Sequence, residues 1–236
     1  MENEQIEQLY RSRYDFKQFY PITSILISQN EVLLPINNEK IELSKEEIQC
    51  KYGDKRVDLP ISFGSINAKF RLAVLGLEPR DSNPKYNIER CDNFVYGTPF
   101  GIEGWTFKNK YYKSFKEVLK RNDCYIYFTD VVKEYEVKKT KEEADKNARK
   151  TFWCKAAENE NMVFLKAEFK LINPTHIVAL GSQTYDFLHE HFGDKVIKVT
   201  HPNARQDKSS KENAWDAVNR QIQSIFENNS DKINIE

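Results

Sequence analysis

The sequence has no excess charge of either sign. Lysine and arginine together number 36 in the 236 residues, and aspartate and glutamate also number 36. Overall charge therefore does not indicate nucleic-acid binding, and any such surface has to come from local clustering. One cluster lies in residues 108–121, where six basic side chains are opposed only by Glu117. Both a solvated helix face and a phosphate-contacting face are compatible with this run.

Long apolar runs and closely spaced cysteines are also missing. Residues 1–8 are acidic and polar, which predicts no secretory signal, and no apolar run approaches the length of a membrane span. The cysteines lie far apart, without the short spacings typical of zinc sites or disulfide frameworks; they are Cys50, Cys91, Cys124 and Cys154. We therefore expect a cytoplasmic protein with no metal, no other cofactor and no membrane contact.

No internal repeat or low-complexity linker divides the chain. Its length fits one large domain with a sizeable interior. We expect a single domain over residues 1–236, in which residues 1–69 form an N-terminal helix and extension packed on a catalytic core of residues 70–226. A glycine-rich phosphate loop is absent as well, which argues against a nucleotide-processing α/β enzyme.

Strands and helices are predicted to alternate in the second part of the chain. Apolar runs typical of buried strands lie at residues 70–76, 124–129, 176–181 and 195–200, and helical periodicity lies at residues 111–121, 163–172, 182–192 and 211–226. This alternation predicts an α/β fold, a three-layer α/β/α sandwich around a mostly parallel four-stranded sheet. Upstream, an amphipathic helix is expected within the first twenty residues, followed by small strands and loops.

Four short segments place chemically distinct side chains beside these strands. They are Gly76-Leu77-Glu78-Pro79-Arg80, Gly97-Thr98-Pro99-Phe100-Gly101, Tyr127-Phe128-Thr129-Asp130 and Thr200-His201-Pro202-Asn203. Three lie at the end of a predicted strand and the other lies in a following loop. All four can therefore meet at the carboxyl edge of one sheet, where α/β folds place their chemistry.

In this order and context the segments resemble the uracil-DNA glycosylase superfamily, over roughly residues 71–207. The resemblance implies a monofunctional DNA glycosylase that flips a pyrimidine out of DNA and hydrolyses its N-glycosidic bond, leaving an abasic site. In it, Glu78 takes the place of the water-activating aspartate, Phe100 that of the ring that stacks on the extruded base, and Asp130 that of the asparagine that recognises uracil. His201 resembles the histidine that stabilises the departing base.

The chemistry of glycosidic cleavage is consistent with these roles. The sugar gains oxocarbenium character while the base leaves as an anion. An ionised glutamate, with an ordinary pKa of about 4.3, can activate water, and a histidine can donate to the base carbonyl oxygen. Structural alternatives stay open, since Glu78 can cap a helix or pair with Arg80. His201 can likewise be a structural histidine, and Phe100 a core side chain.

Asp130 departs from the pattern of the family. Asparagine offers a donor and an acceptor that match uracil, whereas an ionised aspartate can only accept. Cytosine presents an exocyclic amine, which can donate a hydrogen bond to Asp130. The sequence therefore favours cytosine or a modified cytosine as the target. Uracil is the alternative if Asp130 is protonated or caps the strand end, and a catalytically inert module that binds modified DNA is a second alternative.

Two residues beside Glu78 complete the expected base-binding set, namely Leu77 and Arg80. Arg80 stands where some members of the family carry a bulky tyrosine that excludes substituents on the fifth carbon of the pyrimidine. A modified cytosine with a polar substituent, as in some viral genomes, is therefore admissible, and attack on foreign DNA stands beside repair as a role. Arg80 can equally bind phosphate or pair with Asp81.

Three further residues are expected to contact DNA, which can be single- or double-stranded. Arg205 falls where a leucine wedge often enters the helix, while Asn203 and Lys133 lie next to the site in sequence. A lyase step through a Schiff base on Lys133 stays open. Glu134 stands where iron-sulfur members carry a cysteine, so no cluster is expected. We expect the protein to act as a monomer.

Overall fold

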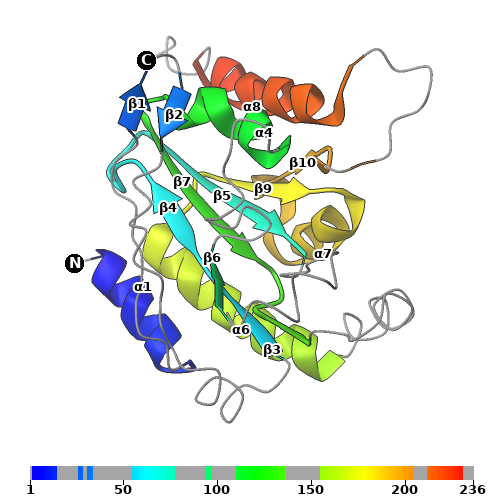
Figure 1. Cartoon of the computed structure of the whole chain (residues 1–236). Helices are drawn as coiled ribbons and strands as arrows, with labels where there is room; N and C mark the ends of the chain where they lie inside the picture. The colour runs from blue at the N-terminus through cyan, green and yellow to red at the C-terminus, as the bar shows by residue number, and fades with distance from the viewer. Residues whose placement is uncertain are drawn as a thin grey trace, which may run out of the picture.

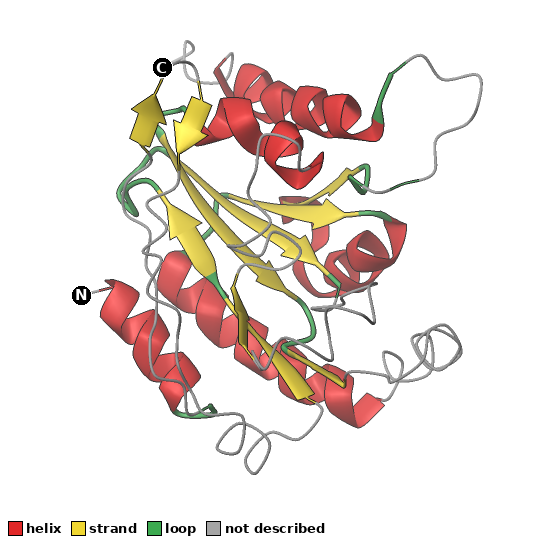
Figure 2. Ribbon diagram, viewed as in Figure 1, coloured by secondary structure: helices red, strands yellow, loops and turns green. Residues whose placement is uncertain are grey.

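The computed structural model describes most of the predicted core. The described residues are 2–14, 26–28, 31–33, 55–77, 94–96, 110–136, 155–202, 204 and 212–230. They form helices on both faces of a central sheet (Figures 1 and 2), so the predicted α/β fold is confirmed. None of the helices in these ranges is long and apolar enough to cross a membrane.

The central sheet has five strands in the order β10-β9-β5-β7-β4. Their bounds are β4 (Ile61–Phe63), β5 (Phe70–Gly76), β7 (Cys124–Asp130), β9 (His176–Leu180) and β10 (Val196–Val199). The pairs β10-β9, β9-β5 and β5-β7 are parallel, whereas β4 runs antiparallel to β7. The near-continuous apolarity of β5 and β7 follows from burial on both faces of a parallel sheet.

The prediction of four strands is corrected to five. The four predicted strands are present close to their predicted bounds, and β4 adds a short edge strand. Its three residues, Ile61-Ser62-Phe63, are too few to show an alternating pattern in the sequence. Because β4 belongs to the central sheet, the core begins before residue 70.

Helices cover the two faces of the sheet in separate groups. The α6 face carries α1 (Glu2–Arg11), α6 (Lys155–Ile172) and α7 (Ser182–Phe192), and the α8 face carries α4 (Lys110–Leu119) and α8 (Ala214–Ser230). Successive strand residues point to opposite faces. In β7, Tyr125 and Tyr127 pack on the α6 face, and Ile126 and Phe128 pack on the α8 face. A short 3-10 helix, η2 (Gly193–Lys195), joins α7 to β10.

A second sheet lies beside the carboxyl end of β7. Its strands are β3 (Lys55–Leu59), β6 (Phe94–Tyr96) and β8 (Glu134–Glu136), in the order β6-β3-β8. A separate antiparallel pair consists of β1 (Leu26–Ser28) and β2 (Glu31–Leu33).

Tyr96, the last residue of β6, is in register with Leu59, two residues before Ile61. Ile61 in turn pairs with Phe128 near the end of β7. Tyr96 therefore lies near the carboxyl edge of the central sheet.

Candidate active site

The carboxyl ends of four parallel strands meet at one edge of the central sheet. Gly76 at the end of β5 is in register with Asp130 at the end of β7, and Leu180 of β9 is in register with Val199 of β10. Residues that follow these strands are therefore neighbours. With strands spaced about 4.8 Å apart, the backbones of β7 and β10 are about 14 Å apart.

Backbone hydrogen bonds join the segments that follow β5 and β7. The amide of Val131 donates to the carbonyl oxygen of Gly76 at 3.1 Å, and the amide of Val132 donates to that of Leu77 at 2.9 Å. The half-buried side chain of Leu77 packs against the core on the α6 face. The chain consequently enters the Glu78 segment from a fixed point beside Asp130.

Asp130 is fully buried, with 0% of its surface exposed. It is the last residue of β7, and strand alternation directs its side chain to the same face as Ile126 and Phe128. An aspartate is rarely buried this completely, because removing a carboxylate from water is unfavourable. It lies at the edge of the sheet where the parallel strands end and where the site is expected.

His201 lies two residues beyond β10, at the same edge of the sheet. It is partly buried, and this burial lowers the pKa of its imidazole below the usual 6.5. A turn follows, in which the amide of Ala204 donates to the His201 carbonyl oxygen at 2.8 Å. At neutral pH the ring is therefore mainly neutral, and a neutral imidazole still carries one N–H donor.

Gly181 supports the position of His201. A Cβ atom built on Gly181 would lie 3.4 Å from the Cβ of His201 and 3.9 Å from its Cδ2. The Gly181 amide donates to the carbonyl oxygen of Val199 at 2.9 Å, which joins the ends of β9 and β10. Sequence analysis placed Gly181 at the end of a strand but assigned it no part in the site.

The structure places Lys133 differently from the prediction. Its side chain is 0% exposed, and its Nζ lies 2.8 Å from Glu168 Oε2. It also donates to the hydroxyl of Thr129. A fully buried ammonium engaged in an ion pair does not reach DNA, so the expected DNA contact of Lys133 is corrected to an internal one.

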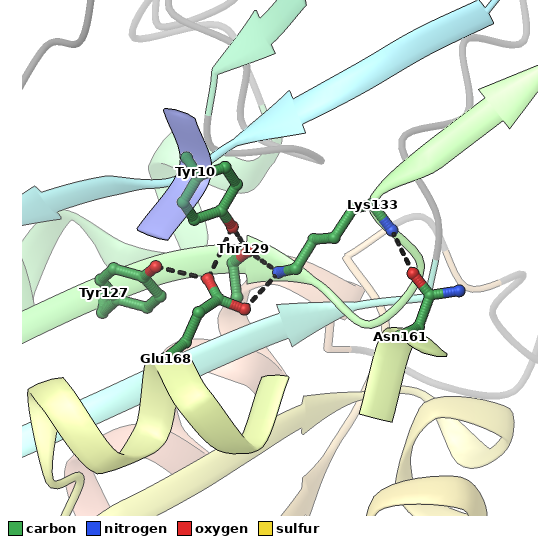
Figure 3. A network of polar contacts seen from close by, with 6 residues as sticks. All are labelled: Tyr10, Tyr127, Thr129, Lys133, Asn161 and Glu168. Atoms are coloured by element: carbon green, nitrogen blue, oxygen red, sulfur yellow. Dashed lines mark hydrogen bonds and ion pairs between the residues drawn. The ribbon is translucent and has the colours of Figure 1, made fainter. Parts of the chain in front are cut away.

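A buried polar network surrounds Lys133 and is shown in Figure 3. Glu168 Oε1 accepts hydrogen bonds from the hydroxyls of Tyr10 at 2.6 Å and Tyr127 at 2.5 Å. The backbone amide of Lys133 donates to Asn161 Oδ1 at 3.3 Å. Burial, together with the Glu168 carboxylate, raises the pKa of Tyr127 well above its usual range, so its hydroxyl stays protonated and donates. We call Tyr10, Tyr127, Thr129, Lys133 and Glu168 the Glu168 network.

Several predicted site residues lie outside the described residues, namely Glu78, Arg80, Phe100, Asn203 and Arg205. Their assignments stay predictions. Leu77 and Tyr96 are described, however, and both lie at or near the carboxyl edge, from which the chain continues toward Glu78 and Phe100 respectively.

The described part of the basic cluster makes contacts within the protein. Lys116 and Lys120 lie 3.8 Å and 3.5 Å from Glu117, and Arg121 pairs with Asp123 at 2.6 Å. The ammonium of Lys113 lies 5.3 Å from the centre of the Trp215 ring. Four basic residues of the run, Lys113, Lys116, Lys120 and Arg121, thus have partners within the protein.

Across the described ranges, no group of three or more His, Cys, Asp or Glu side chains is arranged to hold a metal ion. Comparison with known proteins adds one match. The family model described as the uracil DNA glycosylase superfamily matches residues 63–223, more than half of the chain. No curated protein matches the chain. The matched range contains β5, β7, β9 and β10, with Asp130 and His201 at their carboxyl edge, and it does not contain α1.

Proposed function

Because the chain belongs to the uracil DNA glycosylase superfamily, whose members act on DNA, we propose that it is a DNA glycosylase that excises a cytosine-type base. The base is cytosine or a modified cytosine, flipped out of DNA before its N-glycosidic bond is hydrolysed. The observation that carries the choice of base is the position of Asp130 at the carboxyl end of β7, in register with Gly76 at the end of β5. The proposal that the reaction is that of a DNA glycosylase is based on family membership.

In the proposed reaction, water attacks C1′ of the deoxyribose while the bond from C1′ to N1 of the base breaks. The electron pair of that bond leaves with the base, and the sugar has oxocarbenium character in the transition state. Glu78 takes the proton of the attacking water. The products are an abasic site and a free base, which takes a proton from solvent. No cofactor takes part in this balance.

His201 stabilises the departing base in this proposal. Negative charge grows on the base carbonyl oxygen as the bond breaks, and a fixed N–H donor lowers the energy of that charge. The lowered pKa of His201 supports a neutral donor at neutral pH. Phe100 stacks on the extruded base, since an aromatic ring restores about 1–3 kcal/mol of the lost stacking.

Asp130 selects the base in this proposal. An ionised carboxylate accepts hydrogen bonds only, and the exocyclic amine of cytosine is a donor. Uracil presents a carbonyl oxygen at the same position, so two acceptors would oppose each other. A well-placed pair of this kind discriminates by about 1–3 kcal/mol, or roughly 5- to 150-fold.

A panel of DNA oligonucleotides tests the proposal. Each carries uracil, cytosine or a modified cytosine, in single and double strands, and abasic products are revealed by alkaline strand scission. We expect the wild type to prefer cytosine-type bases and Asp130→Asn to shift the ratio toward uracil by about tenfold or more. Asp123→Asn is the matched control. Asp123 lies directly before the first residue of β7, at the end of the strand opposite Asp130, and it pairs with Arg121.

The outcomes separate the alternatives. An unchanged base preference in Asp130→Asn would refute the role of Asp130 and favour excision of uracil or recognition by another side chain. Binding to modified DNA without any abasic product would favour an inert binding module. Loss of excision in Glu78→Gln with retained DNA binding would support the assignment of water activation to Glu78.

A further inference from the structure

We propose that the Glu168 network positions Asp130 for recognition of the base. The inference rests on the proposed function, and it assigns to Lys133 and Glu168 a positioning role rather than contact with DNA. The network lies on the α6 face of the sheet, and two of its members, Thr129 and Lys133, flank Asp130 in the chain. Figure 3 shows its side chains. Asp130 therefore lies within residues 129–133, the stretch that begins with Thr129 and ends with Lys133.

Lys133 and Thr129 close a short loop around Asp130. The ammonium of Lys133 donates to the Thr129 hydroxyl, four residues earlier in the chain. Asp130, Val131 and Val132 lie between these two residues. Side-chain contact at both ends, combined with the hydrogen bonds from the Val131 and Val132 amides to the β5 end, restrains this loop from two directions.

Glu168 anchors the loop to the helix behind it. Its Oε2 pairs with Lys133 Nζ at 2.8 Å, while its Oε1 accepts from Tyr127, two residues before Thr129. The Lys133 amide adds a hydrogen bond to Asn161 of the same helix. Strand β7 and the loop that follows it are thus attached to α6 at residues on both sides of Asp130.

Tyr10 brings α1 into the same network. Its hydroxyl donates to Glu168 Oε1, its ring lies 5.8 Å from the Lys133 ammonium, and it packs edge-on against Phe164 of α6. Tyr10 lies outside the range matched by the family model, which begins at residue 63. An element of this chain outside the matched core therefore completes the support behind Asp130.

Stability alone does not explain a buried ion pair of this kind. Apolar residues of similar volume often replace such pairs with little loss of stability, whereas buried polar groups can select one conformation. The conformation selected here is that of residues 129–133. We expect that removal of the polar groups leaves the fold intact and loosens the placement of Asp130.

A variant in which all network side chains become apolar tests the inference. It combines Tyr10→Phe, Tyr127→Phe, Thr129→Val, Lys133→Met and Glu168→Leu, so that no network partner stays buried alone. We expect faster hydrogen exchange at the Val131 and Val132 amides and a ratio of cytosine to uracil excision that falls by about tenfold, within the range set for Asp130. Thr129→Val alone serves if that variant does not fold, with an expected fall of about two- to tenfold.

Arg13→Met/Tyr14→Phe is the matched control. Arg13 and Tyr14 contact Glu134 at 3.3 Å and 3.2 Å, so the control removes a second polar link between the N-terminal segment and the core. We expect it to keep wild-type exchange at the two valine amides and the wild-type base ratio.

Three results would overturn the inference. They are unchanged exchange in the folded network variant, faster exchange with an unchanged base ratio, and an equal change of base ratio in the control. A wild type that produces no abasic site from any DNA would instead refute the proposed function. The exchange measurement would then still decide whether the network holds residues 129–133.

Discussion

Gly181 lies beside His201 in a backbone conformation that strains any residue with a side chain. Gly181 has φ 87° and ψ 170°, a backbone conformation that favours glycine. The nearest neighbour of a Cβ atom added to it would be the Cβ of His201, at 3.4 Å. The end of β9 thus lies beside the side chain of His201.

The change Gly181→Ala is expected to strain the backbone beside His201, to shift the imidazole and to lower the excision rate by about tenfold, because loss of a positioned donor reduces stabilisation of the transition state. Backbone strain should also cost about 1–3 kcal/mol of folding stability. Single-turnover kinetics and chemical denaturation measure the two effects.

Gly193→Ala is the control for backbone strain at a position where an added Cβ atom has no neighbour. Gly193 also has a positive φ, 58°, but a Cβ atom there would meet nothing within 4 Å. We expect this control to lose stability and to keep the excision rate. A Gly181→Ala protein as active as the wild type would contradict the role of Gly181.

The pH–rate profile of excision should show the titration of His201, because protonation changes the charge of this donor. Because burial lowers the pKa of His201, the acid limb of the rate profile due to this ring is expected below pH 6.5. An unfolded histidine with its ordinary pKa binds the proton more readily, so folding stability also falls as pH drops from 6.5 through the folded pKa. His201→Asn should lose this limb.

His176→Gln separates the rate from the stability effect. The pKa of His176 is also lowered by burial, and His176 begins β9 at the edge of the sheet opposite the site. We expect this variant to keep the acid limb of the rate profile. An acid limb that disappears in His176→Gln, or that persists in His201→Asn, would assign the titration to another group.

The single change Lys133→Met should destabilise the protein more than the double change Lys133→Met/Glu168→Gln. Removal of one partner leaves a carboxylate buried without its ammonium, which costs about 3–5 kcal/mol. The double change leaves no buried charge, and the amide oxygen of glutamine can still accept from Tyr10 and Tyr127. Urea denaturation followed by circular dichroism measures both. A double variant that loses as much stability as the single one would show that the ion pair itself stabilises the fold.

Cys124 is expected to resist alkylation in the folded protein. Burial at the start of β7 raises the pKa of its thiol to about 12, compared with an ordinary value of 9.0. The reactive thiolate is therefore about a thousandfold scarcer than in an exposed cysteine. Treatment with iodoacetamide at pH 8 followed by peptide mass spectrometry checks this, with urea-unfolded protein as the control. Equal labelling of Cys124 in both states would contradict the prediction.

Apolar patterns were sufficient to predict the central strands. The run from Phe70 to Gly76 is continuous enough to indicate burial on both faces, and its bounds in the structure are the predicted ones. The start of α6 was predicted poorly. This helix begins at Lys155 rather than at residue 163, because its first turns are rich in charged and polar residues and show little apolar periodicity.

The Glu168 network could not be predicted from the sequence. Tyr10 and Glu168 are 158 residues apart, and no local pattern joins them. Lys133 precedes a segment dense in charge, where an exposed lysine is the ordinary expectation. Only the packing of α1 and α6 against β7 shows that its ammonium is internal. By contrast, the position of His201 at the sheet edge followed from a strand that ends just before a proline turn.

The strand order has a consequence for synthesis of the protein. β5 lies in the middle of the sheet, but its neighbour β9 and the outer strand β10 are translated about a hundred residues later. A nascent chain that has left the ribosome only through β7 presents one open flank of β5 and lacks the imidazole. The part of the sheet edge that precedes His201 can therefore form only after β10 has been translated and has docked on β9.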